Sequence, residues 1–276
     1  MACIDFDSRF TRFLRVWLDR FQDEYADIEQ LEQQMPHLYR LFADSPAPWL
    51  DGRTPRNYFE EMQDPGQLVN LIGSYIDEGV PLPDLLLERI AGLGDIAERA
   101  LIQTMQDTSA QEEARMVCIR LLQELGSLSP METYIAWQVQ REDHDDLADF
   151  ALESLEEMGE AAVPLMLEAL ETANDCGREA LLSVLSRYPG HPAVYEGLIR
   201  LFDALPERQA ILAAYLGRLG DERAVPLLQA RAMEEGLGYL DYIELRAAIE
   251  ALGGEAPERQ FEDDPEYEAM RGLESP

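Results

Sequence analysis

Side chains that could do chemistry are few in this sequence, and their spacing matches no familiar catalytic or metal-binding motif. The three histidines, His37, His144 and His191, form neither an HExxH motif nor a repeated His–Glu pair. No glycine-rich phosphate loop follows a predicted strand. Metal and nucleophilic chemistry need such groups at defined spacings. The sequence therefore predicts no catalytic residue, no metal site and no bound cofactor.

The three cysteines, Cys3, Cys118 and Cys176, are odd in number and far apart, and no CxxC pair occurs. Such usage is typical of a reducing compartment. No stretch approaches the roughly 20 apolar residues of a membrane span, and the opening MACIDFDSRF lacks the apolar core of a signal peptide. We therefore expect a cytoplasmic protein.

The acidic run REDHDDLADF, residues 141–150, could bind a hard cation through carboxylate oxygens. Its spacing is not that of an EF-hand, because the central Gly and the closing Glu are missing. A solvated loop that also caps the following helix is the alternative, and we favour it.

The charge of the chain is strongly one-sided. Its 55 acidic and 22 basic residues give a net charge of −33, and every basic residue is arginine. Such a chain repels DNA, RNA and anionic membranes, which excludes direct binding to nucleic acid or membrane as expected functions. The charge also exceeds the net magnitude of about 2 to 8 that solubility usually requires. We therefore expect an acidic surface that could bind a basic partner.

A glycine recurs at intervals of 30 to 33 residues, each time at the end of an apolar helical stripe such as Leu212, Leu216 and Leu219. A period in this range indicates a helical repeat protein, and Gly suits the position after a helix, where φ turns positive. The glycines are Gly94, Gly126, Gly159, Gly190, Gly220 and Gly253.

Several helix starts are also predicted. Thr54, Asp95 and Asp221 are placed to act as N-caps, and the segment SPME at Ser129–Glu132 matches a capping box with Pro130 in the first helical position.

The segments LGDERAVPLLQA and MGEAAVPLMLEA, preceded by REALLSVL or LRAAIEAL, resemble HEAT repeats of the short type also found in bilin lyases. The resemblance covers about residues 80–254. It implies an all-α fold, a right-handed α-α superhelix (a HEAT-like solenoid) of about five or six helix pairs. It implies no single activity, because this architecture serves many unrelated functions.

Two enzyme classes with this architecture fit the chain poorly. Deoxyhypusine hydroxylase binds iron through His–Glu pairs on successive repeats, and none is present here. The HEAT-like alkylpurine DNA glycosylases use a basic concave face, whereas residues 81–276 hold 15 Arg against 40 acidic residues. Bilin-lyase function has no residue signature in this chain.

We expect three regions: an N-terminal helical cap at 1–78, the repeats at 79–254 and an acidic C-terminal tail at 255–276. The tail is expected to be partly disordered and could lie back along the last repeat. In the cap, Phe10, Phe13, Trp17 and Phe21 form one stripe of a long helix and are expected to pack as core. Trp49 lies in a Pro-rich loop and is expected either to clasp the cap or to dock a partner.

The predicted function is a non-catalytic scaffold or adaptor that binds a basic protein or peptide on an acidic face. Two alternatives stay open: a DNA mimic that inhibits a nucleic-acid-binding protein, and, less favoured, a lyase or cofactor-handling protein. The oligomeric state is not predicted. Candidate partner-binding residues are Trp49, Glu156, Glu157, Glu168, Glu222, Glu234 and Glu235.

Overall fold

The computed structural model describes residues 3–21, 28–261 and 264–273. Within these ranges the protein is all-helical and contains no strand. None of the helices there combines the length and apolar content that crossing a membrane requires. The chain divides into two compact units, Met1–Leu128 (unit 1) and Ser129–Pro276 (unit 2), and each is described by itself.

The described residues of unit 1 form seven α-helices and a short 3₁₀ helix, η2. Helix α4 packs against α5, α6 and α7, and its side chains Leu68 and Ile72 form a core with Leu101, Met105 and Ile119. The elements are α1 (Phe6–Phe21), α2 (Ile28–Asp44), η2 (Pro48–Leu50), α3 (Pro55–Glu60), α4 (Pro65–Asp77), α5 (Asp84–Ala91), α6 (Asp95–Gln106) and α7 (Glu112–Glu124).

The first turn of α1 is anchored in unit 1. Phe6 is buried and contacts the rings of Tyr58 and Phe59, with centroids 5.8 and 5.3 Å away. The hydroxyl of Tyr75 donates a hydrogen bond of 3.2 Å to the backbone carbonyl of Ile4. The rest of the predicted core stripe on α1 is only half-buried, because α2 is the one long helix that packs along it within the described chain.

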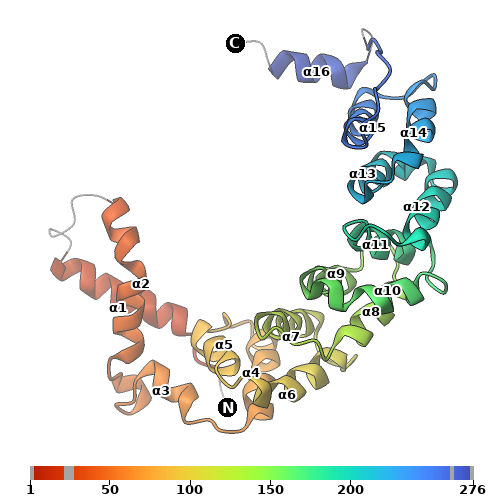
Figure 1. The fold of residues 1–276 in the computed structure, drawn as a ribbon. Coiled ribbons are helices and arrows are strands. Elements are labelled where there is room, and N and C mark those ends of the chain that lie inside the picture. The colour runs from red at the N-terminus through yellow and green to blue at the C-terminus, as the bar shows by residue number, and fades with distance from the viewer. Residues whose placement is uncertain (1–2, 22–27, 262–263, 274–276) are drawn as a thin grey trace. The chain divides into compact units, whose positions relative to one another are not determined.

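Where the structure describes unit 2, the chain forms nine α-helices and three 3₁₀ helices. Figure 1 shows α9, α11, α13 and α15 in one row and α8, α10, α12 and α14 in another. The elements are α8 (Met131–Val139), α9 (Asp146–Met158), η3 (Gly159–Ala161), α10 (Val163–Ala169), α11 (Asp175–Leu185), α12 (Pro192–Ala204), η4 (Pro206–Arg208), α13 (Gln209–Leu219), η5 (Glu222–Ala224), α14 (Val225–Ala232), α15 (Tyr239–Ala251) and α16 (Pro265–Leu273).

The recurrent glycines have the backbone conformation predicted for them. All six have a positive φ, between 56° and 95°, a region that side chains with a Cβ rarely adopt. Gly220, for example, ends α13 in the left-handed conformation with φ 76° and ψ 18°. The repeated glycine therefore marks a repeated backbone turn, as expected from the sequence.

Two predicted caps are confirmed. The hydroxyl of Thr54 accepts a hydrogen bond of 3.1 Å from the backbone N–H of Asn57 at the start of α3. The carboxylate of Asp221 accepts one of 3.1 Å from the backbone N–H of Arg223 at the start of η5.

One other predicted cap is wrong. Asp95 lies inside the first turn of α6, because the N-cap position belongs to Gly94. Pro130, predicted in the first helical position, has helical dihedral angles (φ −82°, ψ −1°) directly before α8, which begins at Met131. The capping box at Ser129 stays a prediction.

The described part of the C-terminal region lies back along α15. Phe261 is buried between the rings of Tyr239 and Tyr242, with centroids 5.3 and 5.0 Å away. The Tyr242 hydroxyl donates a hydrogen bond of 2.7 Å to the carbonyl of Pro257. Helix α16 then packs against α15. Aromatic contacts thus hold a segment whose net charge favours the extended chain.

Candidate functional site

An acidic groove of about 490 Å³ lies in unit 2 along α9, α11 and α13. Charged side chains dominate its lining, and most of them are carboxylates. The lining residues are Arg141, Asp143, Asp149, Leu152, Asp175, Cys176, Glu179, Ala180, Ser183, Leu205, Glu207, Arg208 and Tyr215.

The start of α11 is fixed to the end of α8 by Asn174. The side-chain oxygen of Asn174 accepts a hydrogen bond of 2.7 Å from the backbone N–H of Gly177 and so caps α11. Its amide nitrogen donates to the carbonyl of Arg141 at 2.9 Å, and its backbone N–H donates to the carbonyl of Val139 at 3.1 Å. One residue therefore sets both where α11 begins and where it lies.

Gly177 permits a close approach between α11 and α8. A Cβ at this position would lie 2.2 Å from the backbone oxygen of Gln138, far inside van der Waals contact. Gln138 is fully buried, and its side-chain amide donates a hydrogen bond of 2.8 Å to the carbonyl of Ala148 in α9. The ends of three helices are thus held together beneath the groove.

Arg141 forms one charged wall of the groove. Its guanidinium donates to the Gln138 side-chain oxygen at 3.0 Å and pairs with Asp149 at 2.5 Å. The Arg141 side chain is 10% exposed, whereas that of Asp149 is 53% exposed. The guanidinium is therefore held within the protein, and the free side of the carboxylate faces solvent.

Arg208 and Glu179 form a second ion pair. The Arg208 Nε lies 3.1 and 3.0 Å from the two Glu179 oxygens, and a terminal nitrogen also contacts the carboxylate. This hydrogen bonding raises the pKa of Arg208 above its ordinary value. Nearby, burial raises the pKa of Tyr215, so its hydroxyl stays neutral and can act as a hydrogen-bond donor.

The remaining carboxylates give the groove its charge. Asp175 pairs with Arg178 at 3.0 Å, yet its side chain is 57% exposed. Within the described chain, neither Asp143 nor Glu207 takes part in an ion pair. The groove lining holds five carboxylates and two guanidinium groups. This arrangement can attract a cationic side chain, since unpaired carboxylates lie between helices at a shared opening.

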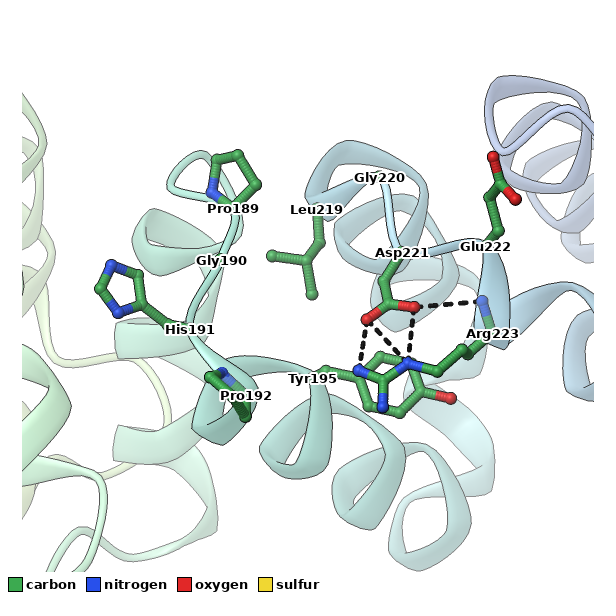
Figure 2. Close-up of a pocket in the computed structure, with 10 residues that line it drawn as sticks. All are labelled: Pro189, Gly190, His191, Pro192, Tyr195, Leu219, Gly220, Asp221, Glu222 and Arg223. Atoms are coloured by element: carbon green, nitrogen blue, oxygen red, sulfur yellow. Dashed lines mark hydrogen bonds and ion pairs between the residues drawn. The ribbon is translucent and has the colours of Figure 1, made fainter.

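A second hollow, the turn groove, has a volume of about 520 Å³ and lies at the opposite ends of α11 and α13. Figure 2 shows the Arg223 guanidinium beside Asp221 and over the ring of Tyr195. The guanidinium carbon lies 4.2 Å from the centroid of this ring. Hydrogen bonds from Arg223 lower the pKa of Asp221. The lining residues are Pro189, Gly190, His191, Pro192, Tyr195, Leu219, Gly220, Asp221, Glu222 and Arg223.

The charges of the turn groove largely satisfy one another. Arg223 holds Asp221 at 2.9 and 3.1 Å through its Nε, and Glu222 points away from both (Figure 2). No nucleophile stands beside a base among the residues that line it. We therefore regard the acidic groove as the better candidate for recognition.

The glutamates predicted from the sequence do not gather on one surface. Glu156 and Glu157 are on α9, where Glu156 pairs with Arg187, and Glu168 is exposed on α10.

Glu222 lines the turn groove, and Glu234 and Glu235 are exposed after α14. Glu234 pairs with Arg231 at 2.6 Å. None of the six predicted glutamates lines the acidic groove, and their role in partner binding stays a prediction.

Trp49 is the predicted residue in unit 1. It is half-buried in η2, its ring meets Phe6 edge-on with centroids 5.7 Å apart, and the Arg9 guanidinium lies 4.9 Å from the ring centroid. These contacts hold the first turn of α1 to the loop, and a clasp between the cap and the first repeat stays a prediction.

The acidic run REDHDDLADF supplies Asp143 and Asp149 to the acidic groove, and Asp145 caps α9 by accepting a hydrogen bond from Ala148 N–H at 2.9 Å. The interpretation of this run as a capping loop is thus confirmed. Across the described ranges, no cluster of three or more His, Cys, Asp or Glu residues has metal-binding geometry. Asp175, Glu179 and Glu207 were not singled out from the sequence, because no local pattern links them to the run.

No protein-family model matches this chain, and no curated protein matches its sequence.

Proposed function

We propose that this chain is a non-catalytic scaffold or adaptor built from HEAT-like helix pairs in a right-handed α-α superhelix, with residues 1–78 as its N-terminal cap. The six glycines with positive φ, 30 to 33 residues apart, support a repeated helix–turn–helix unit. The two rows of helices in unit 2 support the same architecture (Figure 1). Stacked helix pairs offer long surfaces for binding other proteins.

The acidic groove is the proposed binding surface, and its partner is a basic protein or peptide. The observation that carries this is the excess of carboxylates in the lining, five against two guanidinium groups, with Asp143 and Glu207 exposed and in no ion pair within the described chain. This excess negative charge would attract a guanidinium or ammonium group into the groove. Long-range attraction from the net charge of −33 would also speed the encounter with such a partner.

The direct test uses the full chain and a fluorescein-labelled oligoarginine peptide, with binding followed by fluorescence anisotropy. The variant Asp143→Asn with Glu207→Gln removes two negative charges from the groove. We expect its Kd to rise roughly three- to tenfold, since exposed charge pairs are each worth about 0.2 to 1 kcal/mol.

The matched control is Glu168→Gln with Glu235→Gln, which removes two charges from exposed positions outside the groove. An unchanged Kd for the control supports the groove. Equal weakening of both variants would mean that the peptide senses only the total charge. Weakening of the control alone would instead support the glutamates predicted from the sequence.

Cys176 offers an independent measurement, because its exposed side chain lines the acidic groove while Cys118 is buried. Burial also raises the pKa of the Cys118 thiol to about 12, which keeps it unreactive at neutral pH. Bound peptide should slow alkylation of Cys176 in the wild type. A cellular partner captured by the wild type but lost from the groove variant, and displaced by duplex DNA, would favour the DNA-mimic alternative.

A further inference from the structure

Helices α1 and α2 carry an incompletely buried apolar surface in unit 1. Of the 16 residues of α1, only Phe6 is buried. Its other large apolar side chains are half-buried, and Val16 is 62% exposed. They form a broad stripe on one side of the helix, because the i, i+3 and i+4 spacing repeats from Phe10 to Phe21. The half-buried members are Phe10, Phe13, Leu14, Trp17, Leu18 and Phe21.

A single neighbouring helix does not cover this stripe. Helices α1 and α2 cross in Figure 1, and the ring contacts between them join Phe10 and Phe13 to Tyr39 and Phe42, with centroids 5.2 to 5.7 Å apart. Leu14 and Leu18 follow on the flank of the same stripe and stay half-exposed. An apolar stripe of this width usually needs more than one partner helix.

The charges on these two helices are opposite. Helix α1 carries four Arg and two Asp, a net charge of +2, in a chain whose net charge is −33. Helix α2 carries one Arg against two Glu and one Asp, a net charge of −2. Arg12 and Arg15 on α1 and Glu29 and Glu32 on α2 are all exposed. Each helix thus presents the charge that the other lacks.

This complementarity indicates what covers the stripe. In a two-fold symmetric dimer, any surface of one copy meets the same surface of the other, so α1 can face α2 of the partner copy twice. Opposite charges then meet at both contacts while the apolar stripes pack together. An anionic lipid surface would attract α1 and repel α2 and the rest of the chain.

We propose that the α1–α2 pair is a self-association surface, through which two copies of this chain form a symmetric dimer with α1 of each copy against α2 of the other. The apolar stripe supplies the stability, and the charges set which helix faces which. This surface is in unit 1, whereas the acidic groove is in unit 2. Self-association and partner binding in the groove can therefore be tested independently.

The first experiment measures the mass of the full chain by sedimentation velocity across micromolar concentrations. We expect a dimer for the wild type. Leu14→Glu with Leu18→Glu should raise the dimer Kd roughly a hundredfold, because two charges would enter an apolar contact. Val16→Glu with Gln33→Glu is the matched control, with the same added charge at exposed positions outside the stripe, and should stay dimeric. Circular dichroism verifies that all chains remain helical.

The second experiment tests the pairing of α1 with α2 of the partner copy. Arg12→Glu with Arg15→Glu makes both helices acidic, and Glu29→Arg with Glu32→Arg makes both basic. Each variant alone should dimerise roughly tenfold more weakly than the wild type. An equimolar mixture should recover wild-type affinity, because each helix then faces its opposite.

A monomeric wild type would overturn the proposal, as would a mixture no tighter than its components. Flotation with phosphatidylserine vesicles tests the remaining alternative, in which a lipid surface covers the stripe. If the wild type binds these vesicles as a monomer and Leu14→Glu with Leu18→Glu does not, the stripe binds lipid and the dimer is wrong.

Discussion

Helices α1 and α11 are both amphipathic, yet they are buried to very different extents. Helix α1 has 16 residues and buries one of them, whereas α11 has 11 residues and buries six. The sequence of α1 is the richer in large aromatic side chains. The difference lies in the neighbours, because α11 packs against α8, α9, α10 and α12, while α2 is the one long helix packed along α1 within the described chain.

This comparison teaches that an apolar stripe predicts a buried face only when enough helices surround it. In a stack of helix pairs each inner helix has neighbours on both sides, and a terminal helix has fewer. The stripe on α1 is thus a surface that the single chain leaves incompletely covered. Substitutions in the two regions should therefore have different effects on stability.

The largest difference is expected for truncation of leucines. Leu216 in α13 is fully buried, and Leu216→Ala should lower the free energy of unfolding by about 2 to 5 kcal/mol through lost burial and a residual cavity. Leu18→Ala in α1 should cost less than about 1 kcal/mol, because its side chain already contacts water. Urea unfolding followed by circular dichroism gives both values. Equal losses of unfolding free energy would mean that α1 and α13 bury their leucines to the same extent.

An intermediate effect is expected where backbones approach closely. Gly177→Ala places a Cβ against the Gln138 carbonyl oxygen and should destabilise the protein by roughly 1 to 3 kcal/mol. Gly73→Ala is the control in α4, where a Cβ meets no atom within 4 Å. It should stabilise the protein by about 0.5 to 1 kcal/mol, since Ala is the better helix former. Thermal unfolding should show a lower Tm for Gly177→Ala and a higher Tm for Gly73→Ala. Shifts of the same sign in both variants would contradict the close approach of α11 to α8.

The smallest effect is expected in the pH dependence of stability, through the half-buried Tyr39 on α2. Burial raises the pKa of Tyr39 to about 12 from 10.0, and the carboxylates Asp84 and Glu88 add to the shift. A raised pKa means that folding favours the neutral phenol. Its stabilising contribution is complete below pH 10 and is lost as the pH rises towards 12.

The test compares the wild type with Tyr39→Phe in urea at several alkaline pH values. Above pH 10 the wild type should lose stability faster than the variant, because only the wild type has this phenol to ionise. Identical pH profiles would mean that Tyr39 is as hydrated in the folded protein as in the unfolded chain.

Much of the local structure could be predicted from the sequence. The recurrent glycines locate six turns with positive φ, and Thr54 and Asp221 locate two helix starts, because these signals act over a few residues. Prediction failed at Asp95, where the helix begins one residue earlier than the cap chemistry suggested.

The acidic groove could be predicted only in part. The run at residues 141–150 is visible in the sequence, but Glu179 and Glu207 join it only because α11 and the turn before α13 lie beside α9. Conversely, the predicted glutamates Glu168, Glu222 and Glu235 share the same charge without sharing a surface.

The helical class of the protein, the turns between helices and the large negative charge follow from residue type and short-range spacing alone. The set of carboxylates that meet in one groove, and the burial of one apolar stripe but not another, follow from the packing of the helices. Such facts depend on contacts between segments far apart in the chain, and one close approach, of Gly177 to Gln138, can set where a whole helix lies.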